Sequence, residues 1–179
     1  IMAMLRLPTK ESGGRANLHQ GAIGVGVDIA TGITTKAIWH GEEIVFKPGT
    51  ERKLRGIKIP TWDLILETAI KAQEVSHLGY LGVDIVIHPD KGPMVLELNA
   101  QPGLQIQLAN GEGLKKRLER VVDLDVIDIE HGIKISKIAK LDEDELTQQV
   151  VTLSSISEET DQDFHPGKML MSALKFNEE

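Results

Sequence analysis

The chain has 179 residues, 41% of them hydrophobic, which is enough for one ordinary domain with a buried core. Its 20 Lys and Arg against 27 Asp and Glu give a formal net charge of -7, which would repel a phosphate backbone, so we expect no nucleic-acid partner. No apolar run approaches the roughly 20 residues of a membrane span. Cysteine is absent, which excludes disulfides and thiolate zinc sites, and we expect a cytoplasmic protein with no membrane partner.

The first 46 residues predict an antiparallel meander of short strands, expected over residues 1–7, 22–30, 33–39 and 44–46. In the second strand Gly24 and Gly26 alternate with β-branched residues, so something should approach the strand closely on its glycine face. A pocket wall and tight packing of the sheet would both explain this pattern. Because Ile1 already lies within a strand, we expect that an upstream part of the protein precedes it.

The remainder alternates loops, helices and one hairpin. Residues 47–58 form the basic cluster of an otherwise acidic chain and predict a mobile loop. Pro60 and Thr61 then open a helix of about 15 residues that ends near Gly79. A hairpin follows over residues 80–98, with its turn between His88 and Pro93. Residues 111–122 predict a helix with a solvated basic face, and the acidic, polar chain beyond residue 138 predicts a loosely packed or disordered tail.

The hairpin carries the chemistry. A turn centred between Asp90 and Lys91 would place Asp84 directly opposite Glu97, where two like charges are destabilising. Asn99 follows two residues later and so projects from the same face. A bound hard cation, a shared proton or screening by solvent could each offset the repulsion. Carboxylates with an amide oxygen are ligands that Mg²⁺ or Mn²⁺ prefers, and such ions complete their shell with substrate phosphates. An exposed hairpin with two solvated acids remains the alternative.

Two stretches resemble a known family. Gly82-Val-Asp-Ile-Val through Gly92-Pro-Met-Val-Leu-Glu-Leu-Asn-Ala-Gln-Pro-Gly103 resembles the carboxy-terminal core of ATP-grasp ligases. Gly14-Arg-Ala-Asn-Leu-His-Gln-Gly21 looks like the equivalent segment of the ribosomal-protein glutamate ligase branch. Together they resemble the alpha-L-glutamate ligase-like (RimK-related) proteins. The resemblance implies an α+β fold, an antiparallel sheet with helices packed on one face. It also implies a metal- and phosphate-binding subdomain at 1–122, followed by a C-terminal extension at 123–179.

The same resemblance implies an ATP-dependent carboxylate–amine ligase. ATP would phosphorylate a substrate carboxylate, and an amine of a small molecule or peptide would then displace the phosphate, with magnesium or manganese neutralising the phosphate charge. Carried over by motif, Asp84, Glu97 and Asn99 would hold the metal. Arg15 would contact the transferring phosphate through its planar guanidinium, and Asn17 would support the phosphate or the substrate carboxylate.

Two departures from the family pattern bear on activity. Gln101 stands where many ATP-grasp proteins carry an arginine. The basic loop would then supply the missing phosphate contact through Lys47, Arg52, Lys53 or Arg55. The family's upstream lobe, with its adenine pocket, would precede Ile1, so this chain alone is expected to bind ATP poorly. A non-catalytic binding module, a half-domain without activity of its own and a homo-oligomer all stay open.

Overall fold

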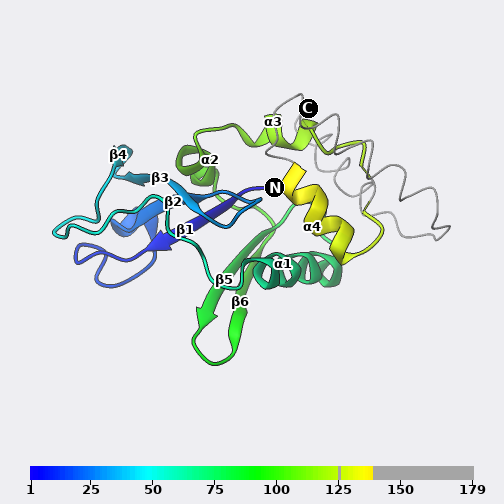
Figure 1. Cartoon of the computed structure of the whole chain (residues 1–179), viewed down its shortest axis with the longest axis horizontal. Helices are drawn as coiled ribbons and strands as arrows, with labels where there is room; N and C mark the ends of the chain where they lie inside the picture. The colour runs from blue at the N-terminus through cyan, green and yellow to red at the C-terminus, as the bar shows by residue number, and fades with distance from the viewer. Residues whose placement is uncertain (125, 139–179) are drawn as a thin grey trace. The chain divides into compact units, whose positions relative to one another are not determined.

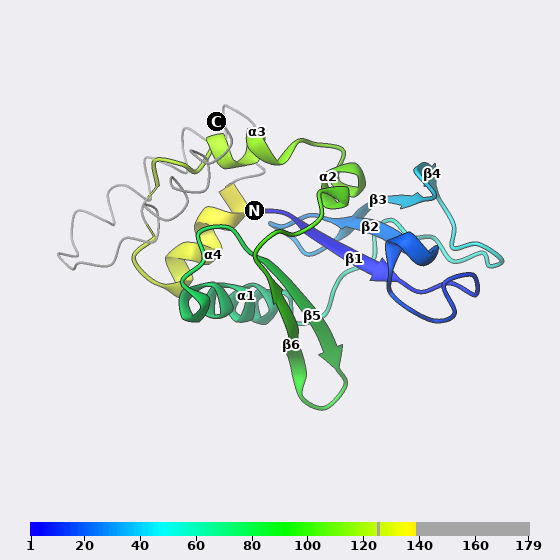
Figure 2. The same cartoon turned by 180° about the vertical axis from the view of Figure 1, so that it is seen from behind.

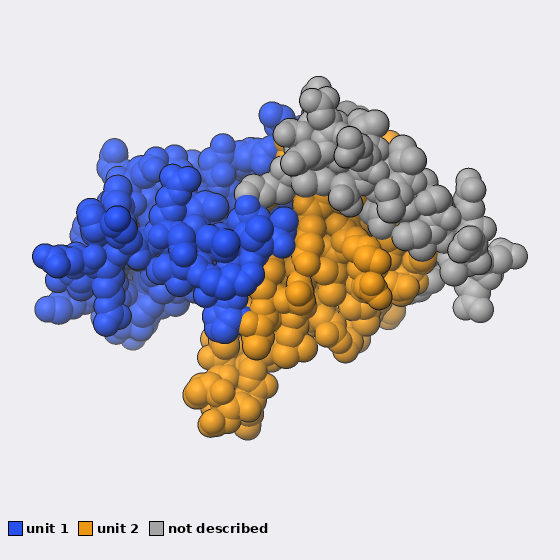
Figure 3. Space-filling model, viewed as in Figure 1, with its two compact units in different colours: residues 1–60, 103–116 blue, residues 61–102, 117–179 orange. Residues whose placement is uncertain are grey.

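The computed structural model describes residues 1–124 and 126–138, and these fall into two compact units. Unit 1 comprises Ile1–Pro60 with Gly103–Lys116, and unit 2 comprises Thr61–Pro102 with the described residues from Arg117 onward (Figure 3). The predicted division of the chain near residue 122 stays a prediction.

Unit 1 contains a four-stranded antiparallel sheet in the order β1-β2-β3-β4, which confirms the predicted meander. Its strands are β1 (Ala3–Leu7), β2 (Ile23–Val27), β3 (Thr34–Trp39) and β4 (Glu42–Ile44). A short 3₁₀ helix, η1 (Leu18–Gln20), lies between β1 and β2. Every residue of β2 is buried, and its Ile23 and Val25 form a core with Ala37 and Leu54.

The helix α2 (Gln105–Asn110) explains one of the two glycines of β2, Gly26. A Cβ added at Gly26 would lie 2.2 Å from the backbone carbonyl oxygen of Ala109 and 2.8 Å from Oγ1 of Thr35. Asn110 adds a hydrogen bond from its Nδ2 to the Ala3 carbonyl oxygen at 3.0 Å. Tight packing, and not a pocket wall, therefore explains the glycine at position 26. The helix itself was not predicted.

The basic segment of residues 47–58 has no regular helix or long strand, but its backbone is tied to the sheet. Lys47 donates its backbone N–H to the Arg52 carbonyl oxygen, and Gly56 and Ile59 donate theirs to the carbonyls of Thr34 and Gly32. Leu54 is buried in the core. A loop was correctly predicted here; its mobility stays a prediction, and these bonds restrict it.

Unit 2 combines helices with one hairpin. The hairpin consists of β5 (Gly82–His88) and β6 (Gly92–Asn99), and α1 (Trp62–Ser76) contacts both strands. The helix α4 (Ile129–Ile138) packs against α1, and the tip of the hairpin projects past α1 in both views (Figures 1 and 2). Buried residues of these two helices make the core of the unit: Trp62, Leu66, Ile135 and Ile138.

Two expectations for the C-terminal part change. The predicted helix at 111–122 is shortened to α3 (Leu114–Glu119), and its basic face is not wholly solvated, because Arg117 is only 2% exposed. Residues 129–138 of the expected extension form α4, which was not predicted. The expected disordered tail beyond residue 138 lies outside the described residues.

The fold class is confirmed as α+β, built from antiparallel sheets and several helices. Among the described residues, no helix has the length and apolar character needed to cross a membrane.

The close approach of α2 to β2 gives a stability prediction. Gly26→Ala should lower the free energy of unfolding by at least about 2 kcal/mol, because a backbone carbonyl must move to admit the methyl group. Gly113→Ala is the matched control, since its Cβ would meet only Oε1 of Gln107 at 3.8 Å. Urea unfolding of both variants measures the difference, and equal midpoints would contradict the packing described.

Candidate functional site

The two strands of the hairpin bring the predicted carboxylates together. Asp84 pairs directly with Glu97 in the antiparallel register, as predicted. Side chains in directly opposed positions lie on one face, with Cβ atoms roughly 4.5–5.5 Å apart. The carboxylates therefore meet on one surface of unit 2, where Asp84 is half-buried and Glu97 is exposed.

The turn of the hairpin differs from the one predicted, although the Asp84–Glu97 pair is the same. His88 pairs with Gly92 and Ile87 with Pro93, so the turn has three residues and is not centred between Asp90 and Lys91 as predicted. A bulge between Asp84 and Ile85 leaves Leu96 as an extra residue on β6. This one-residue shift restores the Asp84–Glu97 pair. A bulge also bends a strand locally and re-aims its side chains.

The apolar residues of the hairpin do not line a core. Leu96 and Leu98 are 65% and 43% exposed, and Val83 and Ile85 are only half-buried. The physical reason is that the hairpin is a two-stranded sheet with α1 along it, and no strand of it contributes a buried residue.

Asn99 completes the oxygen-rich face. It pairs with Gly82, two residues from Asp84, so its position lies on the same face as both carboxylates. Its Oδ1 accepts a hydrogen bond from the backbone N–H of Gln101 at 2.9 Å, which fixes the orientation of the amide. A carbonyl oxygen has two lone pairs, so this oxygen retains capacity for a second partner.

Gly82 allows the chain to fold back beside this face. A Cβ added to Gly82 would lie 2.6 Å from Cβ of Pro102, so a larger residue would displace the turn that follows Asn99. This role could not be predicted with certainty from the sequence, because a glycine at the start of a strand has several common explanations.

The donor set of this face suits a hard divalent cation. Two carboxylates and one amide oxygen are ligands of the type that magnesium and manganese take, with phosphate or water oxygens completing the shell. Residues 1–124 and 126–138 contain no group of three or more His, Cys, Asp or Glu placed to bind a metal ion. A cation held here would therefore depend on the amide and on oxygens of a bound substrate.

Arg15 and Asn17 lie in unit 1, in the loop between β1 and β2, and both are exposed. The Asn17 side chain accepts a hydrogen bond from the backbone N–H of His19 at 2.9 Å and so caps η1. Asn17 thus has a structural role in addition to the predicted ligand contact. The Arg15 side chain makes no hydrogen bond or ion pair with the described residues.

The cations of the basic segment also belong to unit 1. Arg52 and Arg55 are exposed, and Lys47 is half-buried. Thr50 donates its hydroxyl to the Lys47 carbonyl oxygen at 2.9 Å and accepts the Arg52 N–H at 3.2 Å, which shapes the turn between them. The three predicted metal ligands, Asp84, Glu97 and Asn99, thus lie together on the hairpin of unit 2. The residues predicted to contact phosphate lie in unit 1.

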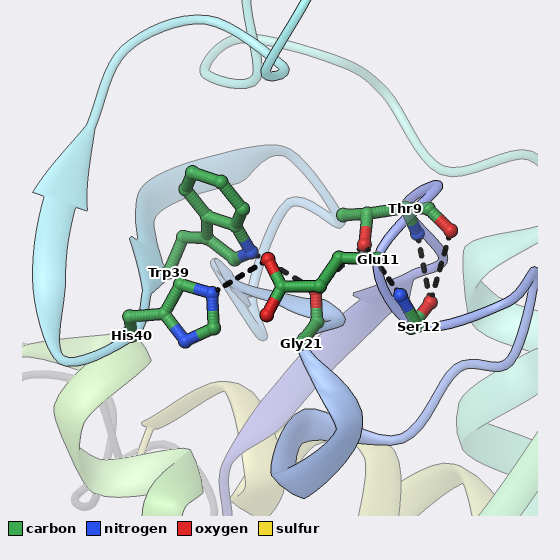
Figure 4. Close-up of polar contacts among 6 residues, drawn as sticks. All are labelled: Thr9, Glu11, Ser12, Gly21, Trp39 and His40. Carbon is green, nitrogen blue, oxygen red and sulfur yellow. Dashed lines mark hydrogen bonds and ion pairs between the residues drawn. The ribbon is translucent and has the colours of Figure 1, made fainter.

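A polar network around Gly21 was not found from the sequence (Figure 4). It joins the loop that carries Arg15 to the end of β3 through Trp39 and His40. The tryptophan could have drawn notice, because a partly buried indole N–H usually has a hydrogen-bond partner.

Comparison with protein-family models gives a match over residues 1–123, to the family described as sugar-transfer associated ATP-grasp. The match covers more than half of the chain, and it includes both the loop that carries Arg15 and the hairpin. The chain belongs to the sugar-transfer associated ATP-grasp family. Searches of curated proteins and of solved structures returned no significant match.

Membership confirms the ATP-grasp resemblance and indicates ATP-dependent, ligase-like activity, since ATP-grasp proteins are generally ATP-using ligases. The matched branch is sugar-transfer associated, and the narrower resemblance to glutamate ligases is not what the family match identifies.

The packing at Gly82 predicts how the ATP-grasp hairpin responds to one methyl group. Gly82→Ala should weaken Mn²⁺ binding about tenfold or more, because shifting Pro102 disturbs the turn that orients the Asn99 amide. Gly103→Ala is the matched control, because nothing lies within 4 Å of its added Cβ. Titration of Mn²⁺ by electron paramagnetic resonance compares the two, and equal affinities would contradict the role assigned to Gly82.

Proposed function

We propose that this chain is the metal- and phosphate-binding part of an ATP-dependent carboxylate–amine ligase that works through an acyl phosphate. The observation that carries the proposal is the directly opposed pair Asp84 and Glu97, with Asn99 on the same face, in a chain of the ATP-grasp family.

Asp84, Glu97 and Asn99 would hold magnesium or manganese beneath the ATP phosphates. The cation would neutralise phosphate charge during transfer. Glu97 is the best candidate to bridge two ions, since its side chain is exposed and makes no hydrogen bond or ion pair with the described part of the chain. Asn99, fixed by the Gln101 N–H, would add a neutral oxygen without adding to the repulsion between the acids.

The cations of unit 1 would bind the nucleotide and the reacting phosphate. Arg15 is exposed, and its guanidinium can bind two phosphate oxygens at once. Lys47, Arg52 and Arg55 would contact ATP phosphates in place of the arginine that Gln101 replaces. Tethering of their segment to the sheet would reduce the entropy lost on binding.

The proposed reaction has two steps that balance. A substrate carboxylate oxygen attacks the γ-phosphorus, the bond to the β-phosphate oxygen breaks and ADP leaves. An amine nitrogen then attacks the acyl carbon, the bond from that carbon to the phosphate oxygen breaks, and inorganic phosphate leaves as the amine loses a proton. Positioned cations stabilise the charge that develops in both steps.

The identity of the substrates is a separate part of the proposal. The segment from Gly14 to Gly21 supports glutamate, through its likeness to the glutamate ligase branch. The description of the matched family supports a substrate connected with sugar transfer. Glutamate and amino sugars are therefore the amines and acids to test first.

A non-catalytic ATP-grasp module is the second candidate, and Gln101 is the observation in its favour. Its side chain is exposed and neutral where an arginine would contact phosphate, and its backbone serves the Asn99 turn. Such a module would bind Mg²⁺ and nucleotide without turnover.

Removing one carboxylate should change stability in opposite directions with and without metal. Glu97→Gln should raise the free energy of unfolding by up to about 1 kcal/mol in EDTA, because it removes a like-charge contact. In Mn²⁺ it should lose the stabilisation that ligand binding gives the wild type. Thermal unfolding with EDTA and with Mn²⁺ measures both effects.

Glu130→Gln is the control for this experiment, because Glu130 is an exposed carboxylate on α4 of the same unit. It should leave the metal-dependent shift unchanged. A Glu97→Gln variant that keeps the full Mn²⁺-dependent shift in thermal unfolding would contradict the proposed metal site.

Turnover separates the two candidate functions. In the full-length protein, magnesium-dependent release of ADP should require a carboxylate and an amine, and Glu97→Ala should abolish it while the fold is retained. Arg15→Lys should retain some activity, because it keeps the charge and loses the planar fork. Saturable MgATP binding with no ADP release for any substrate pair would favour the non-catalytic module.

A further inference from the structure

The loop of residues 9–21, here called the Arg15 loop, is folded on itself at its start. Thr9 and Ser12 exchange hydrogen bonds: the Thr9 N–H donates to Oγ of Ser12 at 2.9 Å, and the Ser12 N–H donates to Oγ1 of Thr9 at 3.0 Å. The N–H of Gly14 donates to the Thr9 carbonyl oxygen, and that of Arg15 donates to the Ser12 carbonyl oxygen. The backbone that leads to Arg15 is therefore fixed without any ligand.

The end of the loop is closed at one oxygen. The Gly21 carbonyl oxygen accepts Oγ1–H of Thr9 at 2.8 Å and Nε1–H of Trp39 at 2.9 Å (Figure 4). The first bond joins the two ends of the loop to each other. The second joins them to β3, where Trp39 packs against the buried core of unit 1.

A second link runs beside the first. Nε2 of His40 lies 3.0 Å from Oε2 of Glu11, and the His40 and Trp39 rings are in contact (Figure 4). Gly21 has a φ of 89°, and a Cβ there would lie 2.9 Å from the Glu11 carboxyl carbon. His40 and Glu11 are both half-exposed, so solvent screens their interaction. This link should therefore be weaker than the hydrogen bond from Trp39.

The Arg15 loop thus combines a rigid backbone with an uncommitted cation. Arg15 is exposed and bonds no described side chain. Fixing the backbone in advance lowers the entropy lost when a guanidinium closes on an anion. We propose that Trp39 is a positioning residue that holds the Arg15 loop, through Gly21, in the form that receives a phosphate-bearing ligand. This inference rests on the proposed phosphate contact of Arg15.

Trp39→Phe tests the role directly, because phenylalanine keeps an aromatic ring against the core while it removes the N–H donor together with part of the indole. Amide hydrogen exchange should accelerate about tenfold in the Arg15 loop and remain unchanged in β5 and β6. Thr68→Val is the control, because it also removes one side-chain bond to a carbonyl, here Leu64 in α1. Exchange in the Arg15 loop that is unaltered by Trp39→Phe overturns the positioning role and leaves the proposed function standing.

A double-mutant cycle shows whether Trp39 acts through Arg15 or merely stabilises the unit. In the full-length protein, MgATP affinity, followed by NMR titration, should fall about tenfold in Trp39→Phe, and this loss should vanish when Arg15→Ala is already present. An equal loss in both backgrounds overturns the inference, because Trp39 would then act elsewhere. An Arg15→Ala variant with wild-type affinity removes the contact that Trp39 would position; it overturns the inference together with that part of the proposed function.

Discussion

Two negative charges meet across one β-hairpin, and the proposed metal site depends on this pair. Asp84 and Glu97 are directly opposed in register, and like charges in that position cost stability unless something neutralises them. A doubly charged ion would do so, and the neutral amide of Asn99 would supply a further oxygen at no electrostatic cost. The bulge at Leu96 and the missing side chain of Gly82 both serve this face, since one sets the register and the other admits Pro102.

A common design appears in the three predicted ligand-binding segments. Each fixes its backbone through local hydrogen bonds or a buried anchor and leaves the charged or amide group accessible. The Gln101 N–H orients Asn99, the Gly21 carbonyl closes the loop of Arg15, and buried Leu54 anchors the segment of Arg52. Stability thus comes from the backbone around the site, and the functional groups keep their bonding capacity for a ligand.

The Asp84–Glu97 pair was predicted from a turn whose register differs by one residue from the observed one, and the bulge at Leu96 restores that pair. Periodicity was enough to predict the meander, α1 and the hairpin. It could not predict the bulge, because alternation assumes an unbroken register and Leu96 breaks it. The six residues of α2 are too few to show a helical period, and burial of Arg117 depends on tertiary contacts that a local charge pattern does not contain. Motifs shared across ATP-grasp proteins likewise identified the superfamily but not the sugar-transfer associated branch.

Anomalous scattering from crystals grown with Mn²⁺ tests the central claim most directly. At least one peak is expected on the hairpin, within coordination distance of carboxylate oxygens of both Asp84 and Glu97, and a bound nucleotide should strengthen it. Crystals at millimolar Mn²⁺ with ATP that show no peak there, or carboxylates turned apart into solvent, would contradict it.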